Sequence, residues 1–294
     1  MTKREMFITA FFMLLLALAL NGELKTKAVD TDDVIAAQNL LGLNFNQAEI
    51  DSMLPGLQDN LNSFRDIHEV ELPNSVMPAV QLNPLPVGFQ IPTGKSEFKL
   101  KPNMSVKRPK DLNDLAFTSI RDLAGLVKQQ KVTSVELTTL FLDRLKKYGS
   151  ELECVISLTE ERAMQAAKAA DAEIKSGSYR GLLHGIPYGA KDLLSTKGIK
   201  TTWGAEAYKD QVIDMDATVI RKLDEAGAVL VAKLTLGALA WGDVWYGGKT
   251  RNPWNKEQGS SGSSAGSAAA TSAGLVPFDV GSEPWGSIVS QATR

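Results

Sequence analysis

The stretch from Gly259 to Ala273 consists of glycine, serine and alanine apart from Thr271. Side chains this small cannot fill a core, so the segment is either a flexible linker or an element that packs closely against larger neighbours. It lies between an aromatic-rich stretch, residues 241–254, and an apolar stretch, Gly274–Val280. We therefore favour a loop that leads into a closely packed helix, with free backbone N–H groups at the helix start, over a linker.

Two helices are predicted in the part of the chain that precedes this run. Residues Thr133–Glu136 have the form of a capping box, and apolar residues at spacings of three and four then predict a helix to about Tyr148. A second helix is expected from about Glu160 to Ser176, because acidic residues open it and Gly177 suits its end. We expect both helices to serve packing.

A helix, a glycine-containing turn and a strand follow one another further along the chain. Residues 217–226 are expected to be helical, and Ala228–Ala232 forms a short apolar run typical of a buried strand. This order favours an α/β fold in which loops at the sheet ends are available for a site.

The first 22 residues have the pattern of a secretory signal. Lys3 and Arg4 precede a mainly apolar run of 13 residues, Ile8–Leu20, which is short for a membrane span. We expect export to the periplasm or secretion, with an uncleaved membrane anchor as the alternative. Cys154 is the only cysteine, so an intrachain disulfide is excluded and a small core residue is expected.

Residues 23–110 are expected to form a proline-rich N-terminal extension without recognisable chemistry. Short helices are predicted between Asp30 and Asn60, and seven prolines between Pro73 and Pro109 break any longer one. The composition changes near Asp111, where we expect a domain of residues 111–294 to begin.

Several classes of function are disfavoured by composition and spacing. The net charge of −2 and the scattered basic residues do not indicate nucleic-acid binding. Only two histidines and one cysteine occur, so no metal site is expected. The segment Gly247–Thr250 resembles the end of a phosphate-binding loop, but Asp243 stands where that loop requires glycine.

Serine chemistry needs a base, and histidine is a poor candidate here. His184 precedes a glycine-proline turn, where we expect a structural histidine bonded to the backbone. Lysine can act as a base only when it is neutral, which requires burial or nearby positive charge. Lys191, which follows the same turn, is such a candidate.

Several blocks of the sequence together resemble the amidase signature family. These blocks are Gly185–Asp192, Thr250–Asn255, the Gly/Ser/Ala run and Gly274–Ile288, and their order and spacing match the family from about Leu115 to Arg294. The resemblance implies an α/β fold with a mixed central sheet covered by helices. It also implies an enzyme that cleaves a carboxamide C–N bond through a Ser-Ser-Lys triad and an acyl-enzyme, without a cofactor.

The resemblance assigns roles to three residues. Lys191 takes the place of the catalytic base, Ser263 that of the bridging serine with a cis peptide bond, and Ser287 that of the nucleophile. Ser263 and Ser287 are 24 positions apart, the separation that the family keeps. Placing the bridging serine at another position of the run, at Ser260, Ser261 or Ser264, breaks this spacing.

The resemblance also implies an oxyanion hole made by backbone N–H groups just before the nucleophile. Proline has no N–H, so Pro284 cannot contribute, and the expected donors are Trp285, Gly286 and Ser287. The loss of a working oxyanion donor costs about 2.7–4 kcal/mol of transition-state stabilisation.

Members of the family usually continue well beyond the nucleophile, whereas this sequence stops at Arg294. We therefore expect a truncated domain that lacks the C-terminal part of its sheet. The leading interpretation is an exported hydrolase of a small-molecule amide, with no nucleic-acid partner and with membrane contact only through the N-terminal segment. The alternatives are an amidase like the A subunit of glutamyl-tRNA amidotransferase and an inactive fragment.

Overall fold

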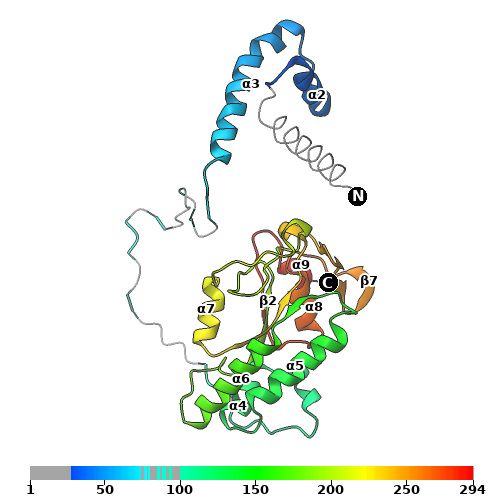
Figure 1. Ribbon diagram of the computed structural model, residues 1–294. Coiled ribbons are helices and arrows are strands. Elements are labelled where there is room, and N and C mark those ends of the chain that lie inside the picture. Colours follow the sequence, from blue (N-terminus) through cyan, green and yellow to red (C-terminus); the bar gives the residue numbers. More distant parts are fainter. Residues whose placement is uncertain are drawn as a thin grey trace, which may run out of the picture. The chain divides into compact units, whose positions relative to one another are not determined.

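A computed structural model describes residues 28–73, 76–77, 79, 85–86, 88–90, 93–94 and 100–293. The chain divides into two units, one within residues 1–93 and the other within residues 94–294 (Figure 1). The predicted signal, residues 1–22, lies outside the described residues, as do several short stretches of the proline-rich segment. Within the described ranges, no helix has the length and apolar character needed to span a membrane.

The described part of the first unit contains two capped helices, α2 (Thr31–Leu41) and α3 (Gln47–His68). Asp30 caps α2 and Asn46 caps α3, each as part of a capping box. The prediction of short helices before Asn60 is wrong for α3, which has 22 residues and contains Pro55. A proline can be tolerated inside a helix at the expense of one backbone hydrogen bond, and here the helix continues past it.

The second unit begins with helices whose ends agree with the sequence. Thr133 forms the predicted capping box, and α5 ends at Tyr148. The second predicted helix ends at Lys175 and is followed by Gly177 with a φ of 89°. The bounds of these first elements are η1 Leu112–Phe117, α4 Ile120–Lys128, α5 Ser134–Tyr148 and α6 Glu160–Lys175.

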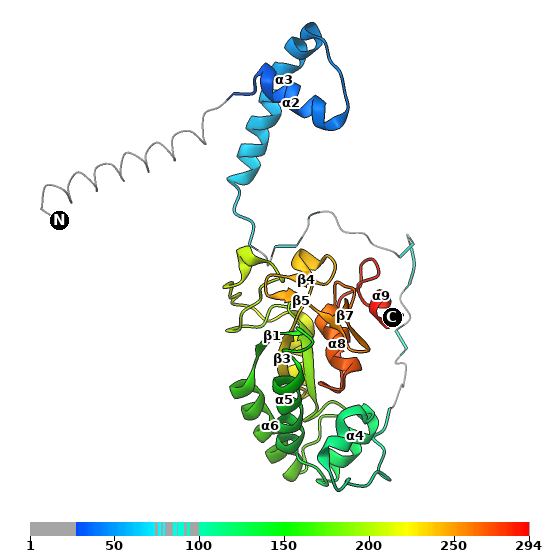
Figure 2. The ribbon, with the colours of Figure 1, turned by 90° about the vertical axis from the view of Figure 1, so that its right-hand side faces the viewer.

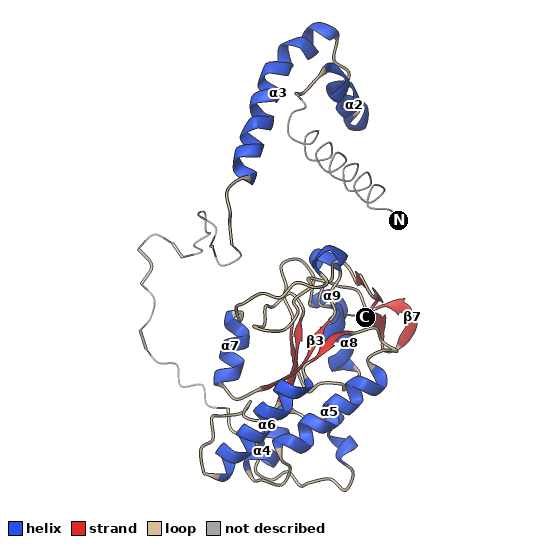
Figure 3. Cartoon of the chain, in the orientation of Figure 1, coloured by secondary structure: helices blue, strands red, loops and turns tan. Residues whose placement is uncertain are grey.

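A four-stranded mixed sheet forms the centre of this unit, which confirms the α/β class (Figure 3). The strand order is β1-β3-β2-β8; β1 is antiparallel to β3, while β2 is parallel to both β3 and β8. Every residue of β2 and β3 is buried, as expected of central strands. The strands are β1 Val155–Leu158, β2 Pro187–Lys191, β3 Val229–Leu234 and β8 Asp279–Val280.

Shorter elements connect the sheet to the site. Two small hairpins, β4 with β5 and β6 with β7, lie between β3 and the Gly/Ser/Ala run. The remaining bounds are η2 Glu206–Tyr208, α7 Thr218–Glu225, η3 Ala238–Ala240, β4 Val244–Trp245, β5 Gly248–Lys249, β6 Arg251–Asn252, β7 Asn255–Gly259, α8 Ala265–Ser272 and α9 Val289–Ala292.

The Gly/Ser/Ala run contains helix α8, so the linker interpretation is wrong. Helices α5 and α6 pack against each other and against β3, whereas α8 lies against β2 and β3 (Figure 2). Ala269 and Ala270 are buried in the same apolar cluster as Cys154, the predicted core cysteine. A Cβ on Gly266 would lie 2.4 Å from the backbone nitrogen of Thr235, so only glycine permits this approach.

The parallel strands bring their carboxyl ends to one edge of the sheet. Lys191 ends β2, Thr235 follows β3 and Ser282 comes two residues after β8. Loops at this edge are the usual position of a site in open α/β sheets.

Candidate active site

The structure brings together the three residues that the sequence selected for catalysis. The Nζ atom of Lys191 donates a hydrogen bond of 2.8 Å to the Oγ atom of Ser263. The Oγ atom of Ser263 lies 3.0 Å from the Oγ atom of Ser287. All three side chains are buried. They therefore form a continuous chain of hydrogen-bonding groups from an amine to a hydroxyl.

Each of these residues is held by the element next to it. Lys191 is fixed by the central strand β2, and Ser263 lies in the loop that leads into α8, where the Gly262–Ser263 peptide bond is cis. Ser287 follows Gly286, whose φ of 89° is a conformation that favours glycine. The N–H of Ser264 donates a 3.0 Å hydrogen bond to the carbonyl of Ser287, which ties the two loops together.

Two serines that the sequence did not assign to the triad also contact the amine. Lys191 Nζ donates to Ser282 Oγ at 2.8 Å and to Ser264 Oγ at 3.1 Å. Ser282 lies beyond the end of β8, and its place in the site depends on the pairing of β8 with β2, so no spacing rule could have revealed it. Three hydroxyl groups thus surround the lysine amine.

Burial lowers the pKa of Lys191 to about 8, since a charged amine loses solvation away from water, while the Glu283 carboxylate acts in the opposite direction. At neutral pH a usable fraction of the amine is therefore neutral. A neutral amine has the free electron pair that a base requires.

Asp192, the residue after Lys191, belongs to a buried ion pair. Lys233 Nζ is 2.8 Å from a carboxylate oxygen of Asp192, and both side chains are fully buried. The other oxygen of Asp192 accepts from the N–H and the hydroxyl of Thr202, at 2.7 and 2.6 Å. The sequence reasoning missed this pair, although a lysine within the apolar strand β3 was a signal for a buried partner.

The predicted oxyanion loop is organised by Glu283. Its carboxylate accepts hydrogen bonds from the backbone N–H of Gly286, from that of Ile288 at 2.5 Å and from that of Val289 at 2.9 Å. These donors hold the pKa of Glu283 below its usual value. The N–H of Gly286, one of the three predicted oxyanion donors, is thus engaged by a side chain of the same loop.

A cavity of about 510 Å³ opens beside the serines. Ser263 and Ser287 line it together with Trp241, Asp243 and Trp285. The nucleophile candidate is therefore accessible from a space large enough for a small molecule.

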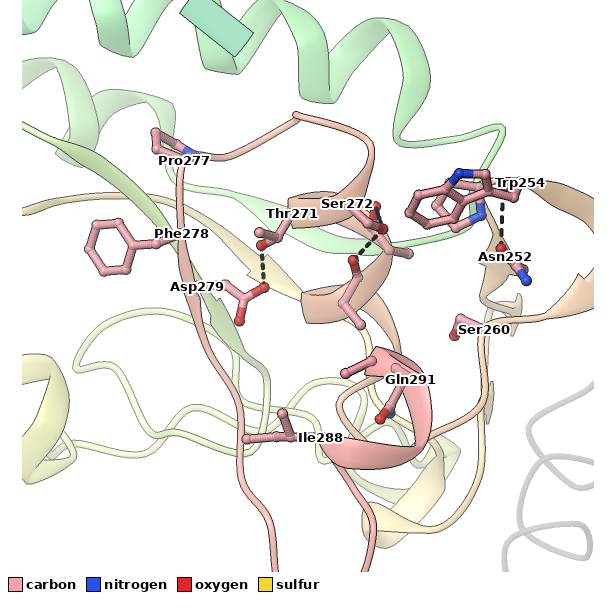
Figure 4. Close-up of a pocket in the computed structure, with 14 residues that line it drawn as sticks. Asn252, Trp254, Ser260, Thr271, Ser272, Pro277, Phe278, Asp279, Ile288 and Gln291 are labelled. Atoms are coloured by element: carbon pink, nitrogen blue, oxygen red, sulfur yellow. Dashed lines mark hydrogen bonds between the residues drawn. The ribbon is translucent and has the colours of Figure 1, made fainter. Parts of the chain in front are cut away.

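A second cavity of about 510 Å³ lies on the α8 side of the unit (Figure 4). Phe278, Ile288 and Asp279 line it, and the hydroxyl of Thr271 donates to Asp279 at 2.5 Å. Burial raises the pKa of Asp279 to about 6. This cavity contains none of the three triad candidates.

The surroundings of His184 and Cys154 indicate structural roles. The Nδ1 atom of His184 accepts a hydrogen bond of 3.1 Å from the backbone N–H of Arg180, as predicted for a structural histidine. Burial raises the pKa of Cys154 to about 12, which disfavours a reactive thiolate. Within the part of the chain that the structure describes, no three potential metal-ligating side chains gather at one place.

Comparison with known proteins identifies the family of this chain. The profile of the Amidase family matches residues 136–292. The A subunit of a glutamyl-tRNA(Gln) amidotransferase from Coxiella burnetii is 42% identical over 173 residues, which cover 58% of this chain and 36% of that protein. The chain thus spans just over a third of the length of this relative.

Solved structures of amidases are also similar to this chain. A peptide amidase from Stenotrophomonas maltophilia is 34% identical with a TM-score of 0.58, and the match covers 61% of this chain and 39% of that one. An amidase family protein from Bacillus anthracis is 29% identical with a TM-score of 0.56, over 61% and 38% of the two chains. The mixed sheet, its covering helices and the family match together show that this chain belongs to the amidase signature family.

Proposed function

We propose that the protein hydrolyses a carboxamide to a carboxylic acid and ammonia or an amine, with Ser287 as nucleophile, Ser263 as relay and Lys191 as base. The observation that carries this proposal is the hydrogen-bonded series from Lys191 Nζ through Ser263 Oγ to Ser287 Oγ. A serine hydroxyl is a weak nucleophile at neutral pH and needs a base within reach.

In the first half of the reaction, Ser287 Oγ attacks the amide carbonyl. Its proton passes to Ser263, whose own proton passes to the neutral amine of Lys191. Hydroxyl hydrogens rotate freely, so the relay can point from Ser287 toward Lys191 when the substrate is bound. The protonated lysine then returns the proton, through Ser263, to the leaving nitrogen, and the C–N bond breaks.

In the second half, water hydrolyses the ester on Ser287. The same relay removes a proton from the water and returns it to the Ser287 oxygen, which restores the free enzyme. The backbone N–H groups of Trp285, Gly286 and Ser287 are the proposed oxyanion donors. Because Glu283 engages the Gly286 N–H, an oxyanion bound by Gly286 must displace this carboxylate.

The experiment is the release of ammonia from simple carboxamides by the full chain and by two variants. Ser287→Ala and Lys191→Ala should each lower the rate at least about 1,000-fold, because the members of a triad act as a unit. Ser272→Ala is the matched control, since that hydroxyl donates to a carbonyl within α8. Hydrolysis by Ser287→Ala at the parent rate would show the proposal to be wrong.

A fluorophosphonate label separates a working nucleophile from an inactive fragment. Labelling of Ser287 that disappears in Lys191→Ala supports an activated serine even when turnover is slow. Soluble, folded chain that takes up no label at Ser287 would favour the inactive fragment.

The identity to amidotransferase A subunits supports a second candidate, an amidase that acts as part of a glutamyl-tRNA amidotransferase. Glutamine would then be the amide that is hydrolysed. Preference for glutamine over simple carboxamides in the ammonia assay would favour this candidate.

We also propose that residues 1–22 direct export, which is at odds with a role in tRNA charging in the cytoplasm. The apolar run Ile8–Leu20 behind two basic residues supports export. A reporter fused to residues 1–30 tests it, and retention of the reporter in the cytoplasm would contradict export.

A further inference from the structure

Two large, exposed tryptophans line the cavity of the candidate active site. Trp241 is 74% exposed and Trp285 is 83% exposed. Their ring centroids lie 6.2 Å apart and their planes are inclined by 30°. We call these two residues the tryptophan pair. Two indoles left open to water beside a nucleophile are typical of a surface that binds an apolar group.

The tryptophan pair comes from two separate loops that the fold brings together. Trp241 follows η3, and its backbone N–H donates to the carbonyls of Gly237 and Ala238, at 3.3 and 3.2 Å. Trp285 lies between Pro284 and Gly286, two positions before Ser287. The nucleophile loop therefore carries one of the two rings itself.

The rest of the cavity lining is small and contains no cationic side chain. Of its twelve lining residues, all within the described chain, none is lysine, arginine or histidine, and Asp243 is the only one with an ionisable carboxylate. The Asp243 carboxylate accepts a hydrogen bond of 3.0 Å from the N–H of Ser261. An anionic substrate would meet a carboxylate with no compensating cation in this lining, so the cavity disfavours anionic ligands.

We infer that the tryptophan pair makes this site selective for amides that carry an uncharged aromatic ring next to the scissile bond. A flat ring can lie against an exposed indole face with its centroid at the distances of 4.5–7 Å that aromatic pairs prefer. Stacking there places the neighbouring carbonyl beside the loop of Ser287. This inference rests on the proposed amide hydrolysis and adds the substrate class to it.

The test compares two amides of similar size, benzamide and cyclohexanecarboxamide. In the full chain, kcat/KM should be higher for benzamide, and Trp241→Ala should reduce that preference on the order of 10-fold, through the KM for benzamide. Trp241→Phe should retain most of the preference, because a ring remains. Trp254→Ala is the matched control: it removes an indole that is 73% exposed and lines the other cavity.

A binding measurement separates this inference from the proposed function. The Ser287→Ala chain cannot form an acyl-enzyme, so quenching of its tryptophan fluorescence by benzamide reports binding without turnover. Trp241→Ala and Trp285→Ala in that background should each weaken benzamide binding, whereas Trp254→Ala should not. If benzamide binds in this way but the parent chain hydrolyses no amide, the proposed hydrolysis is wrong and the aromatic binding site is still supported.

Two results would overturn the inference. One is equal binding of benzamide and cyclohexanecarboxamide to the Ser287→Ala chain. The other is an equal loss of benzamide binding in Trp241→Ala and Trp254→Ala. Circular dichroism of each variant, together with the Phe substitutions at positions 241 and 285, distinguishes a lost ring from a misfolded loop.

Discussion

Lys191 is held where burial and a nearby carboxylate favour different protonation states. Burial disfavours its charge, while the Glu283 carboxylate favours it. A pKa of about 8 is the result, and at this value the amine can both accept and return a proton near neutral pH.

The pH dependence of activity follows from this pKa. In the proposed mechanism the neutral amine is the base, so kcat/KM for an uncharged amide should rise as the pH passes through about 8 and level off above it. Glu283→Gln removes a carboxylate that raises the pKa of Lys191, and the midpoint should therefore move to lower pH. Rates between pH 6 and 10 check both statements; a midpoint unmoved in Glu283→Gln would contradict this electrostatic role.

The Asp192–Lys233 ion pair should matter for stability. Replacing Asp192 by alanine leaves the buried Lys233 amine without its partner, which costs about 3–5 kcal/mol of unfolding free energy. Urea unfolding of the parent, of Asp192→Ala and of Asp192→Leu/Lys233→Met measures it. The double variant should regain much of the lost unfolding free energy because no buried charge remains. An Asp192→Ala variant as stable as the parent would argue against a stabilising ion pair.

At the scale of elements, helix α8 lies close to β3 because its residues are small. Gly266 faces Thr235, which comes directly after β3, and the N–H of Gly266 donates to the Thr235 carbonyl at 2.9 Å. Since Ser263 and Ser264 immediately precede α8, the position of this helix sets the position of Ser263, the proposed relay.

Gly266→Ala should therefore destabilise the second unit. The new Cβ would lie 2.4 Å from the Thr235 nitrogen and 2.5 Å from the Cys154 carbonyl oxygen, and a backbone contact of this kind cannot rotate away. Overpacking typically costs about 1–3 kcal/mol, measurable as a lower midpoint in urea.

Gly56→Ala in α3 is the contrasting change. Its Cβ would meet nothing within 4 Å, and alanine should stabilise the helix by about 0.5–1 kcal/mol. Amide exchange across α3 should become slower in this variant. The two substitutions should change stability in opposite directions: Gly266→Ala lowers it and Gly56→Ala raises it. Equal effects would contradict the close packing of α8.

At the scale of the whole molecule, stability should be unevenly distributed over the sheet. The central strands β2 and β3 are wholly buried, whereas the two-residue strand β8 forms one edge of the described sheet. Native-state hydrogen exchange should therefore be slowest in β2 and β3 and clearly faster at Val280. Equal protection across all four strands would show that the β8 edge is covered in solution.

The sequence by itself determined the local elements and the identities of the triad candidates. Capping residues and apolar spacing are local signals, so α5 and α6 ended close to where they were predicted. The motifs selected Lys191, Ser263 and Ser287 because family spacing is also a property of the sequence alone.

Only the tertiary structure decided which other groups meet these three residues. Ser282 reaches Lys191 because β8 pairs with β2, and Lys233 reaches Asp192 because β3 pairs with β2. Trp241 and Trp285 belong to loops that are distant in the sequence, and they meet because the fold brings these loops together. Contacts between distant segments depend on strand order and helix packing, and no local pattern in a single sequence encodes them.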